Sequence, residues 1–193
     1  MSFSEKNECG TDRMDAAGLI EKPVRENVIY QGKIITLRVD DAMLPDGKPC
    51  KREMVMHPGG ACVLFVREGK VLLVRQFRYA YGEITWEIPA GKLNQGEDPK
   101  DTASRELEEE TGFKPESVEL LYTIYPTPGY TNEKIYIYEA HGVSEGHVHP
   151  DDDEFVDCAF FPLNKALKMI EDGVIRDAKT IIAIQHYLLK EKK

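Results

Sequence analysis

The sequence lacks the two kinds of segment that would send a protein into or across a membrane. None of its apolar runs approaches the roughly 20 residues that a membrane-spanning helix needs, and its first residues lack the basic and apolar regions of a secretory signal. Its four cysteines, Cys9, Cys50, Cys62 and Cys158, form no Cys-x-x-Cys pair. Without a secretory signal, we interpret them as reduced thiols rather than disulfides. We therefore expect a cytoplasmic protein that does not bind membranes.

Positive charge is also in short supply. The chain has 25 lysine and arginine residues against 34 acidic residues, which gives a net charge of −9. Nucleic acid backbones and anionic membranes are bound by basic surfaces, so neither is an expected partner. A small anionic substrate that arrives with its own metal ion stays compatible with this charge. The 193 residues, 41% of them hydrophobic, suffice for one well-cored domain with an extension.

The pattern of apolar residues and turns divides the chain into three parts. We expect residues 1–18 to be disordered, residues 19–58 to form a small antiparallel β extension that serves dimerisation, and residues 59–193 to form the main domain. In the main domain we expect strands at 61–66, 71–77, 83–89, 118–126, 134–143 and 155–161, and helices at 99–111, 162–172 and 177–190. The first two strands, joined by a short turn at Gly69, are expected to pair as a hairpin. This order predicts an α+β fold with helices on both faces of a mixed sheet.

The most informative stretch runs from Gly91 to Phe113 and has the sequence GKLNQGEDPKDTASRELEEETGF. It predicts a helix with clear ends. Asp98 can cap the start, Pro99 suits the first helical position because no amide donor is needed there, and Gly112 can end the helix in a left-handed conformation.

Three carboxylates gather on one face of this helix. Glu106, Glu109 and Glu110 are related by i+3 and i+4 spacing, whereas Ala103 and Leu107 form an apolar stripe on a different face. Two carboxylates about 5 Å apart repel by roughly 0.8 kcal/mol in bulk water but by about 3 kcal/mol at the effective dielectric of a cleft. A solvated acidic face is the simple alternative, but a helix built for solubility would pair Glu with Lys at i+4. A hard divalent cation such as Mg²⁺ would relieve the repulsion.

The same stretch resembles a defined motif. Its residues match every fixed position of the box G-x5-E-x7-R-E-U-x-E-E-x-G-U, where U is apolar, that defines the Nudix hydrolases. The matching residues are Gly91, Glu97, Arg105, Glu106, Leu107, Glu109, Glu110, Gly112 and Phe113. With each fixed type at roughly 5–10% of residues, a chance match is far rarer than about one in a million. The resemblance implies an α/β/α sandwich that binds Mg²⁺ and cleaves a diphosphate linked to another moiety.

Flanking residues make the chain similar to the ADP-ribose pyrophosphatase subfamily. The runs Arg75–Arg78 and Glu87–Leu93 precede the box, and Pro128 lies 15 residues after Phe113 in the run PTPGYTNE. The extra N-terminal sheet is a further matching feature. This resemblance implies hydrolysis of ADP-ribose to AMP and ribose 5-phosphate, with Mg²⁺ as the cofactor and Mn²⁺ as a substitute.

The resemblance also implies roles for the residues of the box. The expected metal ligands are Glu106, Glu110, Glu109 and the carbonyl of Ala90. Glu106 and Glu110 are the principal ligands, and Glu109 is either a ligand or a support for one. Glu109 and Arg105 also belong to the expected catalytic set. Arg105 is expected to pair with Glu97 and fix the loop against the helix, although such a pair can also be a surface salt bridge of little energetic worth.

The general base must lie outside this helix, because a metal-bound carboxylate is a poor proton acceptor. The resemblance places it in the acidic loop at 151–154, where Glu154 aligns best. Asp153 and Asp151 are rivals, and an acidic loop can also be simply solvated.

The expected substrate-binding residues are Arg52, Arg78, Tyr30 and Pro128. A planar guanidinium suits phosphate or the terminal ribose, but either arginine could equally be a structural ion-pair residue. Adenine needs an aromatic or apolar slot, for which Tyr30 and Trp86 are candidates, although a tryptophan in a central strand is more often core. Pro128 could also belong to an ordinary loop.

The N-terminal extension predicts an oligomer. A small sheet cannot bury its own faces, and the resembled subfamily exchanges this sheet between subunits, so we expect a homodimer whose substrate site is shared by two chains. Three other functions stay open: hydrolysis of other nucleoside diphosphate sugars, non-catalytic binding of ADP-ribose, and structural calcium binding. The intact carboxylates argue against a mere binding module, and their position on a helix argues against a calcium loop.

Overall fold

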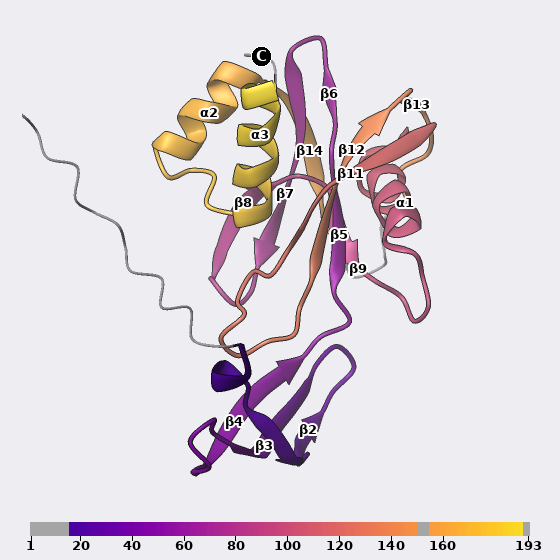
Figure 1. Ribbon diagram of the computed structural model, residues 1–193. Coiled ribbons are helices and arrows are strands. Elements are labelled where there is room, and N and C mark those ends of the chain that lie inside the picture. The colour runs from indigo at the N-terminus through magenta and orange to yellow at the C-terminus, as the bar shows by residue number, and fades with distance from the viewer. Residues whose placement is uncertain (1–15, 150–154, 191–193) are drawn as a thin grey trace, which may run out of the picture. The chain divides into compact units, whose positions relative to one another are not determined.

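The computed structural model describes residues 16–149 and 155–190. The chain divides into two compact units, with the boundary between Met56 and His57, and the two are described separately. Figure 1 shows the helices and strands of each unit. Most of the segment 1–18 lies outside the described residues, and its last residues begin a short 3₁₀ helix, η1 (Ala16–Leu19). None of the helices in the described ranges is long and apolar enough to cross a membrane.

The first unit is a four-stranded antiparallel sheet. Its strands are β1 (Lys22–Arg25), β2 (Val28–Gln31), β3 (Thr36–Met43) and β4 (Pro49–Met56). β3 pairs with β4 along its whole length and also pairs with β1 and β2. Leu44 N donates to Lys48 O (2.8 Å) across the turn between β3 and β4. β1 was not expected, because Pro23 and a register shift interrupt its pattern.

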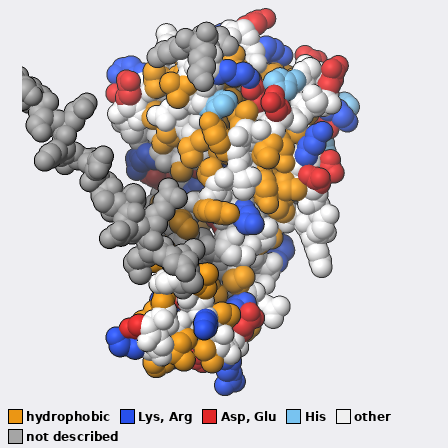
Figure 2. All heavy atoms as spheres, in the orientation of Figure 1, with side chains coloured by type: hydrophobic (Ala, Val, Ile, Leu, Met, Phe, Trp, Pro, Cys, Tyr) orange, Lys and Arg blue, Asp and Glu red, His pale blue; other side chains and the backbone are white. Residues whose placement is uncertain are grey.

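This sheet buries few side chains. Among the described residues of the unit, only Asp40 and Ala42 are buried. Its exposed large hydrophobic residues are Leu19, Ile20, Val24, Val28, Ile29, Tyr30, Ile34 and Ile35. Figure 2 shows hydrophobic side chains at the surface of this unit among charged ones. A sheet with so small a core gains little stability from its own packing.

The described part of the second unit contains two four-stranded sheets and a two-stranded one. The mixed sheet has the order β11 (Ser117–Ile124), β12 (Ile135–His141), β5 (Gly60–Leu64) and β9 (Ala90–Lys92), with β12 parallel to β5 and the other neighbours antiparallel. The antiparallel sheet has the order β14 (Asp157–Pro162), β7 (Lys70–Arg78) and β6 (Val66–Arg67), with β8 (Glu83–Glu87) also paired to β7. The short sheet pairs β10 (Phe113–Lys114) with β13 (Ser144–Glu145).

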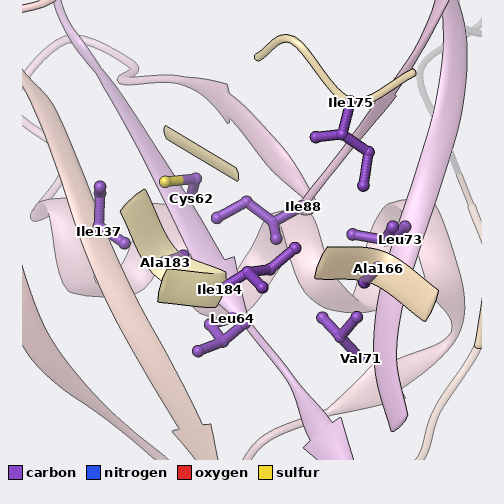
Figure 3. Packing of buried hydrophobic residues seen from close by; sticks show 10 residues of the cluster. All are labelled: Cys62, Leu64, Val71, Leu73, Ile88, Ile137, Ala166, Ile175, Ala183 and Ile184. Atoms are coloured by element: carbon purple, nitrogen blue, oxygen red, sulfur yellow. The ribbon is translucent and has the colours of Figure 1, made fainter. Parts of the chain in front are cut away.

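Helices cover both faces of these sheets. Figure 1 shows α1 (Pro99–Thr111) on one side, and α2 (Leu163–Glu171) and α3 (Ala178–Lys190) on the other. The side chains of β5 alternate accordingly: Ala61 and Val63 pack in a cluster with Leu107 of α1, whereas Cys62 and Leu64 pack in a cluster with α2 and α3 (Figure 3). A strand buried on both faces reads as one continuous apolar run. The predicted α/β/α sandwich is confirmed.

One predicted pairing is present only in part. The two apolar runs joined at Gly69 do not form a continuous hairpin, because β5 belongs to the mixed sheet and only the short β6 pairs with β7. The strand breaks at Phe65, and the chain then turns at Glu68 and Gly69, which both have positive φ (52° and 70°). A continuous apolar run predicts a buried strand but does not specify which neighbour it pairs with.

The ends of α1 follow the predicted capping. The side chain of Asp98 accepts a hydrogen bond from Lys100 N (2.9 Å), and Pro99 begins the helix. Gly112 ends it with φ 73°, and its N–H donates to Glu108 O (2.8 Å). Local sequence alone therefore fixes the position of this helix in the chain.

Replacing Gly112 by alanine is expected to destabilise the fold. The left-handed backbone alone should lower the free energy of unfolding by about 1–2 kcal/mol, and the new Cβ would also lie 2.9 Å from Cγ2 of Val148. Gly173→Ala is the matched control, because Gly173 has φ 70° and open space around its missing side chain. Urea unfolding of both variants measures the difference, and equal losses would show that the Val148 contact contributes nothing.

Candidate active site

Two glutamates of α1 lie against β9. A Cβ on Gly91 would stand 1.9 Å from Oε1 of Glu106, so any side chain at this position would occupy the place of the carboxylate. Glycine alone lets the strand approach the helix this closely. One residue earlier, Ala90 N donates a hydrogen bond to Oε2 of Glu110 (3.0 Å). Successive residues of β9 therefore meet the two glutamates that are predicted as the principal metal ligands.

Both carboxylates are largely removed from solvent. Glu106 is 6% exposed and Glu110 is 4% exposed. Burial of a carboxylate is unfavourable unless hydrogen bonds or cations compensate it. Part of that compensation comes from the amide of Ala90 at Glu110 and from Nη1 of Arg105, which lies 2.9 Å from Oε1 of Glu106. The result is a pair of neighbouring hard oxygen donors held in a low-dielectric setting.

Arg105 connects the carboxylates of the box. Its Nε lies 2.9 Å from Oε1 of Glu97, and its Nη1 lies 2.6 Å from Oε2 of Glu109 as well as contacting Glu106. The expected Glu97–Arg105 ion pair is therefore present and is part of a larger network. The hydrogen bonds to Glu97 are the largest cause of an Arg105 pKa above its ordinary value.

Glu97 also holds the loop that precedes α1. Its Oε2 accepts a hydrogen bond from Asn94 N (3.0 Å) while Arg105 binds the same carboxylate. Arg105 is the main cause of a Glu97 pKa lowered from 4.5 to about 2. Because the folded pKa is depressed, this contribution to stability is complete above the ordinary pKa and is lost as the pH falls through about 2.

The donor set suits a hard divalent cation. Glu106 and Glu110 present carboxylate oxygens at one place on β9, which is chemistry that Mg²⁺ and Mn²⁺ accept. Within residues 16–149 and 155–190, no three His, Cys, Asp or Glu side chains converge in an arrangement that could hold a metal ion. Glu109, for its part, is engaged by Arg105. The first two glutamates fit the metal, and the assignment of Glu109 and of the Ala90 carbonyl as ligands stays a prediction.

The two arginines predicted to bind substrate both make ion pairs. Nε and Nη2 of Arg78 each lie 2.7 Å from a carboxylate oxygen of Glu87, in a bidentate arrangement. In the N-terminal unit, Nε of Arg52 lies 2.8 Å from Oε2 of Glu21. The structural role that the sequence left open is therefore present at both positions, and their contact with substrate stays a prediction.

The other predicted residues lie in different settings. Tyr30 is 58% exposed on β2, and Pro128 is exposed in a turn. Trp86 packs edge-on against Phe161, with ring centroids 4.8 Å apart, next to the buried cluster of α2 and α3. Trp86 therefore has the core role that the sequence favoured. The candidates for the general base, Glu154, Asp153 and Asp151, lie outside the described residues.

The sequence did not reveal a buried ion pair between α3 and β8. Nζ of Lys179 lies 2.5 Å from Oε2 of Glu87, and the two side chains are 8% and 4% exposed. A signal was available, because Lys179 and Thr180 share the buried face of α3 with Ala183 and Ile184. Lysine is almost never fully buried unless it is paired, so a lysine on the inner face of a helix indicates a buried carboxylate partner.

Known proteins with similar sequences decide the family. A family profile described as NUDIX domain matches residues 56–183. The chain belongs to the NUDIX family. Its NUDIX domain begins next to the boundary between the two units and includes the whole site around β9 and α1.

Two NUDIX relatives are similar over nearly their whole length. The chain is 44% identical over 176 residues to a protein named ADP-ribose pyrophosphatase from Bacillus subtilis (strain 168), covering 90% of this chain and 95% of the relative. It is also 44% identical over 174 residues to a protein named Methanol dehydrogenase activator from Bacillus methanolicus, covering 89% and 94%. A solved structure described as an ADP compounds hydrolase matches with a TM-score of 0.75 and 20% identity, over 88% of this chain and 93% of that one. At that identity the similarity shows the NUDIX fold alone.

Gly91→Ala is expected to damage the site more than the fold. The new Cβ would displace the carboxylate of Glu106, and the affinity for Mn²⁺ should fall by about 10–100-fold, the range typical when the surroundings of a metal ligand are disturbed. Titration of Mn²⁺ followed by electron paramagnetic resonance measures this. Gly129→Ala is the control, because Gly129 is exposed and has no atom near its missing side chain. Unchanged Mn²⁺ affinity in Gly91→Ala would contradict the placement of Glu106.

Proposed function

We propose that the protein hydrolyses ADP-ribose to AMP and ribose 5-phosphate in a reaction that depends on Mg²⁺, with Mn²⁺ as a substitute. Water attacks one phosphorus of the diphosphate, and the bond from that phosphorus to the bridging oxygen breaks. The oxygen of water stays on the attacked phosphorus, the bridging oxygen leaves with the other phosphate, and the protons of water pass to a base and then to solvent.

The observation that carries this proposal is the seating of Glu106 and Glu110 on β9. Their buried carboxylates, with the carbonyl of Ala90, would hold the cation beside the substrate. When bound, a divalent cation supplies charge neutralisation for the diphosphate and activation of water as a nucleophile. The protein itself supplies the geometry of the site. Because Gly91 has no side chain, β9 lies close enough to α1 for the Glu106 carboxylate to fill the space of a Cβ.

Three other charged side chains orient the carboxylates, bind phosphate and accept a proton in the proposed reaction. Arg105 makes ion pairs with Glu106 and Glu109 and so orients both carboxylates. Arg78 offers a planar donor array that suits the phosphate oxygens. Glu154 is the proposed general base, as the resemblance implies, and it takes the proton of the attacking water.

The names of the relatives support the substrate. The Bacillus subtilis protein is named ADP-ribose pyrophosphatase, and the alignment with it covers 95% of that relative, so the two share more than the box. The Bacillus methanolicus protein shows the same identity and bears the name of an activator. A second candidate function is therefore activation of a dehydrogenase. A protein that acts only in this way would raise the dehydrogenase rate without turning over ADP-ribose.

Two narrower alternatives concern the same site. A nucleoside-diphosphate-sugar pyrophosphatase of broad range would use the same carboxylates on several substrates. A non-catalytic binding module would have no need of them. The intact box therefore favours an enzyme.

A substrate comparison tests the proposal. With Mg²⁺, the wild-type protein should release AMP from ADP-ribose faster than from ADP-glucose or diadenosine polyphosphate, as measured by product chromatography. Glu106→Gln and Glu110→Gln should each lower kcat on the order of 10²–10³-fold, because each removes charge that stabilises the transition state. Binding of ADP-ribose without AMP release would favour the binding module. Wild-type rates in both variants would overturn the metal assignment.

We also infer a homodimer that exchanges the N-terminal sheet. Support comes from the exposed hydrophobic residues of the first unit, which buries only Asp40 and Ala42 among its described residues. A partner chain would cover part of that surface. In this arrangement Arg52 and Tyr30 of one chain serve the substrate site of the other.

Mixing two inactive variants tests the shared site. Arg52→Ala and Glu110→Gln homodimers are each expected to be nearly inactive. Because a two-fold dimer has equivalent interfaces, subunit exchange should restore about a quarter of the wild-type activity, from heterodimers that contain one intact site. Mixing Glu106→Gln with Glu110→Gln is the control, since both changes lie in the same box and cannot complement each other. No recovery in the first mixture, with exchange verified by mass spectrometry, would rule out the shared site.

The free thiols and the net charge bear on the location and the partners of the protein. The free thiols of Cys50, Cys62 and Cys158 are compatible with the cytoplasmic location that the sequence predicts. The net charge of −9 continues to disfavour nucleic acid and anionic membrane partners.

A further inference from the structure

The N-terminal turn of α3 is joined to β8 by a buried ion pair. Nζ of Lys179 lies 2.5 Å from Oε2 of Glu87 and 2.9 Å from Oδ1 of Asp177. Burial opposes the charged form of Lys179, but the carboxylates of Asp177 and Glu87 outweigh it and raise the pKa of the ammonium. The lysine is therefore a fixed positive charge, 92 residues away in sequence from the carboxylate that it binds.

Glu87 also binds Arg78. Its carboxylate accepts from Nε and Nη2 of Arg78 at 2.7 Å each, and from Oγ1 of Thr85 at 2.5 Å. Burial alone would raise the pKa of Glu87, but Arg78 and Lys179 together hold it well below its usual range. Lys179 and Arg78 both bind the carboxylate of Glu87. The edge of the Arg78 guanidinium that carries Nε and Nη2 is therefore fixed in place.

The Arg78 side chain is more exposed than the carboxylate that it binds. Its side chain is 38% exposed, whereas that of Glu87 is 4% exposed, so the guanidinium lies at the border between the core and solvent. Glu87 binds Nε and Nη2, which form one edge of the guanidinium. The hydrogen bond with Glu87 is the largest cause of an Arg78 pKa above its ordinary value, and the charge of Glu110 on α1 adds a smaller contribution of the same sign.

The same turn of α3 also holds the backbone next to the site. Ile88 N donates a hydrogen bond to Oγ1 of Thr180 (2.8 Å), and Thr180 Oγ1 donates to Oδ2 of Asp177 (2.5 Å). Two residues after Ile88, Ala90 N binds Glu110. One helix turn therefore fixes residues 87 and 88, just before the strand that receives the catalytic carboxylates.

We propose that Lys179 is a positioning residue for the substrate diphosphate: through Glu87 it holds the guanidinium of Arg78 in one orientation, in which Arg78 binds a phosphate oxygen. A role in stability alone explains the pair less well, because replacing a buried ion pair by apolar side chains is often neutral or stabilising. A guanidinium held in one orientation by a carboxylate, by contrast, is preorganised for an anion. This inference rests on the proposed hydrolysis of a diphosphate.

A double-mutant cycle on Lys179 and Arg78 tests this proposal. Lys179→Met should raise the KM for ADP-ribose by about 10–100-fold, the cost of displacing a binding group by a remote change, and should change kcat less. In the Arg78→Gln background the same substitution should have no further effect on KM, because the group that it positions is already gone. Lys179→Arg, which keeps the charge, should recover most of the loss.

The matched control is Lys190→Met at the other end of α3. It removes another lysine–glutamate pair, with Glu139 (3.1 Å), from the same helix. The control should leave KM unchanged. If Lys179→Met does not fold, as judged by its melting curve, Glu87→Gln takes its place in the cycle, because it removes the charge and keeps the shape.

Binding of inorganic pyrophosphate in the presence of a chelator separates this inference from the proposed function. Calorimetry should show weaker pyrophosphate binding in Lys179→Met than in the wild type, whether or not ADP-ribose is the substrate. Equal pyrophosphate affinity, or a KM effect of the same size with and without Arg78, would overturn the positioning role. Failure of the wild type to hydrolyse ADP-ribose would instead count against the proposed function.

Discussion

The close contact between Gly91 of β9 and Glu106 of α1 is the constraint on which the rest of the site depends. The carboxylate occupies the space of a missing Cβ, so no side chain fits at position 91 without displacing it. Ala90 adds the amide contact to Glu110. β9 is in turn paired with β5, whose two faces pack into the cores on either side of the sheet. The position of the carboxylates is therefore set by the packing of the whole second unit.

Charge compensation explains how an acidic chain keeps carboxylates buried. Arg105 makes ion pairs with the box glutamates, whereas Arg78 and Lys179 make ion pairs with Glu87. Removing one partner of a buried pair typically costs about 3–5 kcal/mol, because the other charge is left uncompensated. In the mechanism that we propose, the first network orients the groups that bind the cation, and the second fixes a group that binds the phosphate.

The sequence predicted local features better than long-range contacts. The limits of α1 followed from Asp98 and Gly112, because caps are local chemistry. The hairpin at Gly69 is present but shorter than predicted, because β5 pairs in the mixed sheet and an apolar run does not identify its pairing partner. The Lys179–Glu87 pair was missed for the same reason: its members are 92 residues apart, and only the folded chain brings them together. The box was found because its spacing lies within one loop and one helix.

Anomalous diffraction from crystals soaked in Mn²⁺ locates the divalent cation. We propose that Glu106 and Glu110, which lie against β9, bind the cation on which hydrolysis depends. The expected result is an anomalous peak within coordination distance of oxygens of both carboxylates, about 2.0–2.6 Å, that disappears in Glu110→Gln. A peak bound to other side chains, with these two glutamates unliganded at saturating Mn²⁺, would rule out this metal site.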